Sequence, residues 1–108
     1  MTEFSELTPA MRQYMQAKKD LSSDTILLFR MGDFYELFFE DAKIAAPLME
    51  VVLTSRAGVP MCGVPYHALR TYIARILNGG LKVAIAEQIE DPKLARGLVK
   101  RDITQVIT

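Results

Sequence analysis

The sequence predicts an α+β domain of two layers, with about three helices packed on a mixed sheet of about five to six strands. Residues 66–78 carry apolar side chains at helical spacing, which is the clearest helix signal in the chain. Short β-prone runs at 26–31, 34–38 and 82–88 are bounded by turn residues. The chain has 108 residues, so we expect a single domain over residues 1–108.

The most distinctive segment is a predicted β-hairpin at residues 26–38. Only Gly32 and Asp33 separate its two β-prone runs, and glycine supplies the positive φ that a tight hairpin turn requires. The second strand therefore starts near Phe34, and its side chains alternate between two faces. A carboxylate is seldom buried unless it is paired, so Glu36 indicates that its neighbour Phe34 lies near water. The two faces are predicted to hold Tyr35, Leu37 and Phe39 on one side and Phe34, Glu36 and Phe38 on the other.

Two helices are predicted before and after this hairpin. The first begins at Thr8-Pro9, because threonine is a favoured N-cap and proline fits the first helical position. The second runs from Glu40 to about Met49, where early acidic residues suit the helix dipole. Pro47 removes an internal hydrogen bond from that helix, so we expect a kink or an early end.

The remaining elements follow from short apolar runs and the turn residues between them. Asn78-Gly79-Gly80 ends the clearest helix with residues that tolerate a left-handed cap. The last strand still continues at the end of the sequence, so we expect a piece of a longer polypeptide. In chain order the elements are strands at 51–55 and 59–64, a helix at 66–78, a strand at 82–88, a loop or short helix at 89–97 and a strand at 99–107.

The composition is that of an ordinary globular protein, with 50% hydrophobic and 24% charged residues. The formal net charge is zero, which argues against a nucleic-acid binder that depends on its own charge alone. Residues 1–6 are acidic and lack the pattern of a secretory signal, and no apolar run is long enough to span a membrane. The single cysteine, Cys62, is expected to be a small core residue. We therefore expect a cytoplasmic protein.

Phe34 and Glu36 are the leading candidates for function. A rigid apolar ring at a hairpin tip can enter a base step, unstack it and kink the duplex. An ionised Glu36 is repelled by phosphates, so it weakens binding to ordinary duplex and gains only where a base presents a donor or the carboxylate takes up a proton. From spacing alone, the favoured interpretation is instead that Phe34 folds back on the core beside a solvated Glu36.

Other candidate sites give weaker signals. His67, the only histidine, is expected to have a structural role in the first turn of a helix, and we expect no metal site there. A metal-dependent nuclease needs an acid-x-Lys pattern, which occurs at 41–43 and 91–93, on a predicted helix and beside a proline. Basic residues are scattered, but four near the C-terminal end could contact phosphates: Lys93, Arg96, Lys100 and Arg101.

Long motifs, in order along nearly the whole chain, resemble the N-terminal mismatch-recognition domain of the bacterial DNA mismatch-repair family MutS. This resemblance is far more specific than any single short pattern, and it makes the wedge the preferred interpretation. The matching segments are Thr8-Pro9, 29–38, Asp41-Ala42, 60–68, 83–88, Asp91-Pro92 and 101–108.

The resemblance implies an α/β unit whose Phe-x-Glu motif reads the lesion. Phe34 matches the phenylalanine that stacks on the mispaired base from the minor groove, and Glu36 matches the glutamate that hydrogen-bonds that base in kinked DNA. It implies no catalytic site or cofactor in this domain, with ATP and Mg²⁺ used elsewhere in a dimeric parent. The implied partners are double-stranded DNA with mispairs or small loops, the remaining MutS domains, a second copy of the parent and downstream repair factors.

Two departures from the family pattern are visible. The loop at residues 55–60 is shorter than in many bacterial members, and Pro47 lies in a helix that is usually free of proline. A protein-interaction domain, whose hairpin tip docks on a partner, remains the alternative from another functional class, and the nuclease remains a third.

Overall fold

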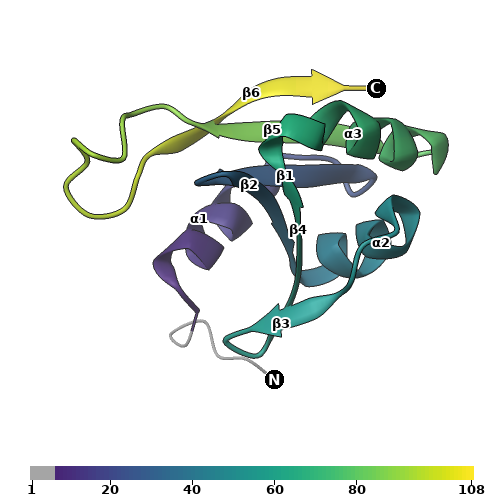
Figure 1. Ribbon diagram of the computed structural model, residues 1–108, viewed down its shortest axis with the longest axis horizontal. Coiled ribbons are helices and arrows are strands. Elements are labelled where there is room, and N and C mark those ends of the chain that lie inside the picture. Colours follow the sequence, from purple (N-terminus) through teal and green to yellow (C-terminus); the bar gives the residue numbers. More distant parts are fainter. Residues whose placement is uncertain (1–6) are drawn as a thin grey trace.

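The computed structural model describes residues 7–108, in which three α-helices cover one six-stranded sheet (Figure 1). The acidic stretch at residues 1–6 lies outside the described residues. Strand β1 pairs antiparallel with β2 and parallel with β5, so the sheet is mixed, and its order is β3-β4-β2-β1-β5-β6. The predicted fold class is confirmed. The strands are β1 (Thr25–Met31), β2 (Phe34–Phe38), β3 (Thr54–Arg56), β4 (Val59–Pro65), β5 (Lys82–Gln88) and β6 (Arg101–Ile107).

Helix α1 (Pro9–Lys18) begins where its sequence predicts. The Thr8 hydroxyl accepts a hydrogen bond from the backbone N–H of Met11 at 3.2 Å, which satisfies one of the free donors of the first turn. Pro9 occupies the first helical position, where its missing N–H removes no helical bond.

Helix α2 (Phe39–Met49) keeps its predicted end despite Pro47. The helix continues for two residues beyond the proline and ends at Glu50, which is left-handed with φ of 60°. Of the two outcomes expected, a kink or an early end, the early end is wrong: Pro47 lacks only its own N–H, and its fixed φ is helical, so the next two residues stay in the helix.

The elements after α2 differ from the prediction mainly at their boundaries. Strand β3 is a three-residue edge strand that starts later than expected, and residues 89–100 form a loop before β6. The predicted helix at 66–78 begins as a 3₁₀ turn, η2 (Tyr66–Ala68), and continues as α3 (Leu69–Asn78). Short 3₁₀ segments are common at helix ends, where apolar periodicity does not distinguish them.

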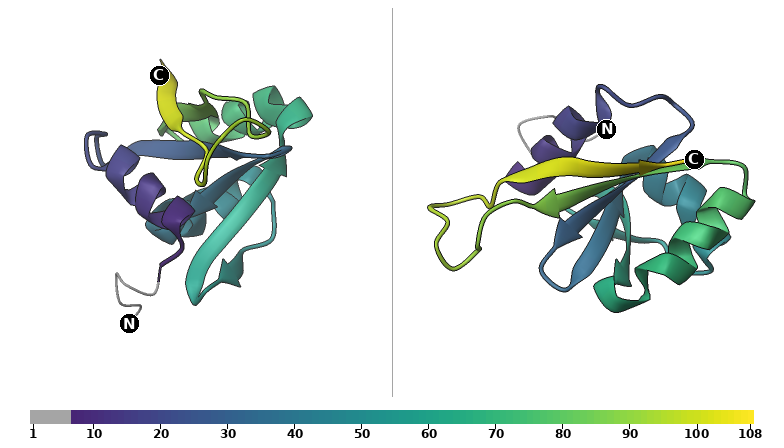
Figure 2. Two further views of the ribbon diagram at one scale, coloured as in Figure 1. Left: turned by 90° about the vertical axis from the view of Figure 1, so that its left-hand side faces the viewer. Right: turned by 90° about the horizontal axis from the view of Figure 1, so that it is seen from above.

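The helices lie on both faces of the sheet, so the domain has three layers and not two (Figure 2). On one face, Ile26 and Leu28 of β1 pack with buried residues of α2 and α3. On the other face, Leu27 and Phe29 of β1 pack with α1. A strand buried on both faces reads as a continuous apolar run, which is why the β1 sequence shows no alternation.

Phe39 is the largest local departure from the predicted hairpin. Its backbone is left-handed, with φ of 59°, so the strand stops at Phe38 and the chain turns into α2. The Phe39 ring lies 6.3 Å from that of Tyr14, on the α1 face and not beside Tyr35 and Leu37. Bulky residues rarely adopt this conformation, so alternation along the strand could not predict it.

Cys62 is a core residue, as expected. Its side chain is buried, its thiol lies 3.9 Å from the Ala42 carbonyl oxygen, and burial raises its pKa to about 11. The thiol therefore stays protonated and covered at neutral pH, and we expect it to react with a disulfide reagent only when the domain unfolds. Labelling rates in increasing urea test this prediction, and fast labelling of the folded protein would contradict it.

The described residues include no helix that is long and apolar enough to cross a membrane.

Candidate nucleic-acid interface

The tip of the β1–β2 hairpin presents an exposed aromatic ring. Gly32 adopts φ of 62°, which lets the chain reverse so that Met31 pairs with Phe34. The backbone N–H of Tyr66 donates to the Asp33 carbonyl oxygen at 2.9 Å and ties the turn to the end of β4. Phe34, the first residue of β2, remains 49% exposed. The prediction that its ring lies near water is confirmed.

The prediction that Glu36 lies on a solvated face is wrong. Glu36 is only 8% exposed, and Phe38, on the same face of β2, is 1% exposed. This face packs toward α1, so both sides of β2 are covered. Glu36 tolerates this burial because Arg56 Nη1 lies 3.0 Å from its Oε1, and a buried carboxylate is stable only when it is paired and hydrogen-bonded.

Two opposing effects act on the Glu36 carboxyl. Burial raises its pKa, because a low-dielectric environment disfavours the ionised form, while the charges of Arg56 and, more weakly, Arg101 act to lower it. Burial is the larger effect, so the pKa lies above its usual range. The tip therefore holds a carboxylate that accepts a proton more readily than an ordinary surface glutamate.

The other face of the hairpin is held by a network centred on Arg30, which we call the hairpin brace. The Arg30 guanidinium lies 4.7 Å from the centroid of the Tyr66 ring, and Arg30 Nη1 lies 3.5 Å from Glu87 Oε1. The Tyr35 hydroxyl donates a hydrogen bond to the Glu87 carboxylate. These contacts join β1 and β2 to the end of β5 and fix the direction of the turn.

The turn itself is also tied to β5. The Gly32 backbone N–H donates to the side-chain oxygen Oε1 of Gln88 at 3.0 Å, and Arg30 Nε donates to the Gly32 carbonyl oxygen at 2.5 Å. Sequence reasoning did not find the brace or the partner of Glu36, because each joins residues far apart in the chain. These two bonds hold the turn that precedes Phe34 to β1 and β5.

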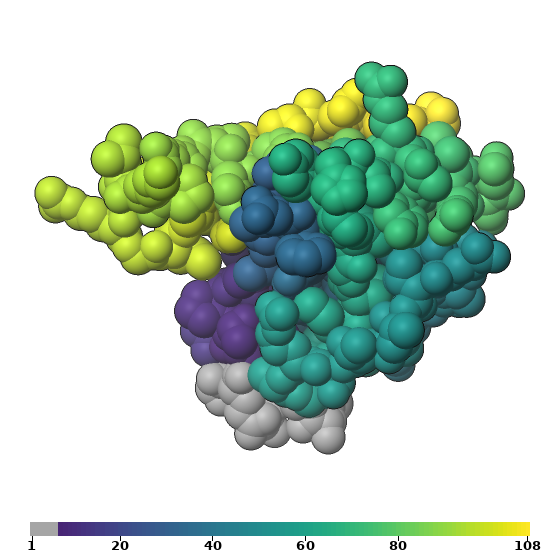
Figure 3. Space-filling model, in the orientation of Figure 1, coloured from purple at the N-terminus to yellow at the C-terminus, as the bar shows by residue number. Residues whose placement is uncertain are grey.

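The four basic candidates separate into two groups. Lys93 and Arg96 are exposed in the loop between β5 and β6, which projects from the body of the domain in Figure 3. Lys100 is exposed at the end of the same loop. Arg101 is half-buried: its guanidinium donates to the Arg30 carbonyl oxygen and to Gln13 Oε1, and it lies 5.0 Å from the centroid of the Phe29 ring. Arg101 therefore has a structural role in addition to its charge.

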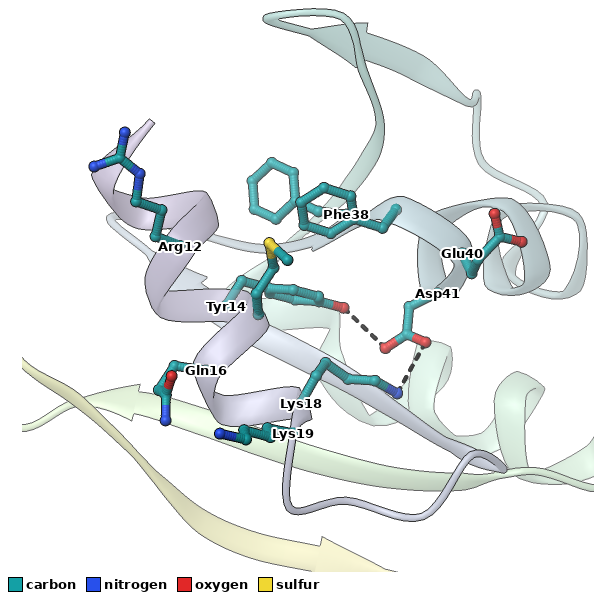
Figure 4. Close-up of a pocket in the computed structure, with 10 residues that line it drawn as sticks. Arg12, Tyr14, Gln16, Lys18, Lys19, Phe38, Glu40 and Asp41 are labelled. Atoms are coloured by element: carbon teal, nitrogen blue, oxygen red, sulfur yellow. Dashed lines mark hydrogen bonds and ion pairs between the residues drawn. The ribbon is translucent and has the colours of Figure 1, made fainter. Parts of the chain in front are cut away.

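Asp41, the acid of one nuclease pattern, forms a structural site between α1, β1 and α2. Its Oδ2 accepts a hydrogen bond from the Leu27 backbone N–H at 2.9 Å and lies 2.9 Å from the Tyr14 hydroxyl. Its Oδ1 pairs with Lys18 Nζ at 3.1 Å (Figure 4). Burial, together with the Asp41 charge, raises the pKa of Tyr14 well above its usual value. These contacts use both carboxylate oxygens for folding.

A surface cavity of about 500 Å³ lies beside Asp41, between α1 and the start of α2 (Figure 4). Phe38 and Phe39 line it, so it lies at the opposite end of β2 from Phe34. The structural role predicted for His67 and the second nuclease pattern, at 91–93, concern exposed residues. His67 is exposed in η2, where its ring packs edge-on to Tyr66 at 5.8 Å. Asp91 Oδ1 accepts a hydrogen bond from the Lys93 backbone N–H in the projecting loop.

The fold and the tip together define a mixed-sheet α+β domain that presents an exposed aromatic ring and a paired carboxylate on one hairpin. A sequence model of the family described as MutS domain I matches residues 8–108. The chain therefore belongs to the MutS domain I family.

Several bacterial proteins named DNA mismatch repair protein MutS are similar to this chain. The protein of Carboxydothermus hydrogenoformans is 60% identical over 106 residues, which cover 94% of this chain and 12% of that protein. The protein of Caldicellulosiruptor bescii is 57% identical over 95% of this chain and 12% of its own length. The protein of Syntrophomonas wolfei is 54% identical over 96% of this chain and 13% of its own length. The chain thus spans about an eighth of the relatives it matches.

Proposed function

We propose that this domain recognises mispaired bases in double-stranded DNA as the N-terminal part of a longer MutS protein. The observation that carries the proposal is Phe34, which is 49% exposed at a hairpin tip in a chain of the MutS domain I family. The partners proposed for the parent are mispaired DNA, its other domains, a second copy of itself and downstream repair factors. Its proposed ATP and Mg²⁺ chemistry lies outside this chain.

The physics of a mispair favours such a reader. A mispaired base stacks and pairs weakly, so the duplex kinks there at a lower cost than at a matched pair. A phenylalanine stacks on any base, and it therefore suits recognition of deformability better than a side chain that reads a particular base edge. The brace on Arg30 and Glu87 supports this role, since a wedge must keep its direction while it separates two bases.

Charge supports the proposal in a different way. The chain has no net charge, so this domain contributes few phosphate contacts and other parts of the parent must hold the duplex. The exposed Lys93, Arg96 and Lys100 are proposed phosphate contacts, because the loop that carries them follows Gln88, whose side chain is hydrogen-bonded to the hairpin turn.

Glu36→Gln is expected to raise the affinity of the full-length parent for matched DNA by about fivefold, because it leaves the exposed cation of Arg56 without its neutralising partner, and attraction of that cation to a phosphate is worth about 1 kcal/mol. The preference for a mispair falls accordingly. Competition binding with matched and mismatched duplexes at fixed salt measures both effects. An unchanged preference would remove Glu36 from the proposed reader.

The fold should survive this change. The folded-state pKa of Glu36 is raised, so the protonated carboxyl stabilises the fold and its ionisation costs stability. This contribution is fully present below the ordinary pKa of a glutamate and is lost as the pH rises through the folded-state pKa. Glutamine stays neutral and avoids that cost. Urea unfolding at neutral pH is therefore expected to show no loss of stability. The same binding assay separates the alternative of a protein-docking tip, for which matched and mismatched duplexes would be equivalent.

A further inference from the structure

Glu36 cannot meet a base in the conformation described above, because its carboxylate is covered. The side chain of Glu36 is 10% exposed, whereas that of its partner Arg56 is 48% exposed. The guanidinium therefore lies on the solvent side of the pair. A base that approaches from outside reaches Arg56 before it reaches the carboxylate.

Arg56 is placed on a part of the fold that can release it. It belongs to β3, a three-residue edge strand in which every residue is exposed. The turn that follows, Ala57-Gly58, is left-handed at both residues, with φ of 51° and 76°. Glu36, in contrast, lies on β2 between β1 and β4. Movement of the arginine thus disturbs no core packing, while the carboxylate stays fixed.

We propose that Arg56 is a specificity-determining residue of the mismatch reader: it holds Glu36 ionised on the sheet until a mispaired base takes its place. This inference rests on the proposed function of Glu36. In the absence of a mispair, the guanidinium covers the carboxylate, so matched DNA meets no free acceptor at this position. At a mispair, a base donor replaces the guanidinium donor, so the carboxylate never loses its hydrogen bond.

Loss of Arg56 should change the protonation of Glu36. Burial already raises the pKa of Glu36 with Arg56 present, and removal of the nearest cation raises the pKa further. Arg101 is the other charge that acts on this carboxyl, but its guanidinium is bound to Gln13 and to backbone oxygens. Arg30 and Glu87 lie on the opposite face of the sheet, with Tyr35.

The test compares Arg56→Met with wild type in the full-length parent, with the ratio of mismatched to matched affinity as the readout. The ratio is expected to fall, because loss of the nearest cation raises the pKa of Glu36 and leaves less of the carboxyl in the ionised form. The sign of the pH effect follows: the variant takes up its proton at a higher pH than wild type. As the pH is lowered, its ratio should therefore begin to fall at a higher pH than the ratio of wild type does.

Two variants control for charge and for folding. Lys43→Met removes a cation that also pairs with a glutamate, at 3.1 Å, but on the exposed surface of α2, and it should leave the ratio unchanged. Arg56→Lys keeps the charge beside Glu36 and should restore most of the ratio.

The decisive arm repeats Arg56→Met in a Glu36→Gln background, where the inference predicts no further change in the ratio. An equal loss of affinity for both duplexes, independent of pH and retained in that background, would identify Arg56 as a phosphate contact and overturn the inference. An unchanged ratio in the single variant would also overturn it. If Phe34→Ala and Glu36→Gln both keep the wild-type ratio, the proposed function itself fails, and the inference fails with it.

Discussion

Phe34→Ala is expected to abolish the preference of the full-length parent for mispaired DNA while leaving the domain folded. Stacking of a base on an aromatic ring contributes about 1–3 kcal/mol, so affinity for the mismatched duplex should fall by about tenfold or more. Affinity for matched DNA should change little, because the proposed wedge would enter only where the duplex kinks easily. Competition binding at fixed salt gives both affinities in one experiment.

Two matched variants show whether this effect belongs to the tip. Phe38, on the same strand and face, is 1% exposed, so Phe38→Ala should destabilise the domain by about 3–5 kcal/mol. Phe34 is half exposed, so its replacement should cost about 1 kcal/mol or less. Leu94, which is 81% exposed in the β5–β6 loop, provides an apolar surface control. Unfolding of the Phe34→Ala protein would assign Phe34 to the core and contradict the wedge.

Asp41→Ala is expected to have the largest effect on stability among the polar substitutions, about 3 kcal/mol or more. The change leaves the buried Leu27 N–H without its acceptor, which lies at 2.9 Å in wild type. It also leaves the Lys18 ammonium beside an empty space and without its ion-pair partner. The Tyr14 hydroxyl still has the Leu27 carbonyl oxygen at 2.8 Å, which limits the loss. Urea unfolding measures the difference.

The neighbouring Glu40 provides the control for Asp41. Its side chain is 75% exposed and pairs with Lys43 across the helix surface, so Glu40→Ala should change stability by less than about 0.5 kcal/mol. Equal effects of the two substitutions would show that the Asp41 network contributes little to the fold. The outcome also concerns function, because the same carboxylate was a candidate metal ligand in the sequence.

Local signals in the sequence predicted much of the fold. Thr8-Pro9 marked the start of α1, Gly32 and Asp33 marked the turn between β1 and β2, and the apolar run at 82–88 marked β5. Each of these signals acts over a few residues: a cap, a positive φ or a run of β-prone side chains. Family resemblance added the candidate roles of Phe34 and Glu36, which spacing alone left open.

The remaining features depend on tertiary contacts. The sequence predicted a solvated Glu36, because its partner, Arg56, lies 20 residues away on another strand. Asp41 reads as a favourable charge in a first helical turn, whereas in the fold it joins α1, β1 and α2. The coverage of both faces by helices is also hidden, because an apolar run such as β1 does not show on which side each helix packs.

The most direct test of the mismatch reader follows the ring of Phe34 itself. The parent carries 4-fluorophenylalanine at position 34, and its fluorine resonance is recorded alone, with matched duplex and with a duplex that contains one mispair. The aromatic ring current of a stacked base changes the chemical shift of the fluorine. We therefore predict a large change in that shift with the mismatched duplex and little or none with the matched one. Equal shifts with both duplexes, or none with either while the mismatched duplex is bound, would contradict the assignment of Phe34 as the mismatch reader.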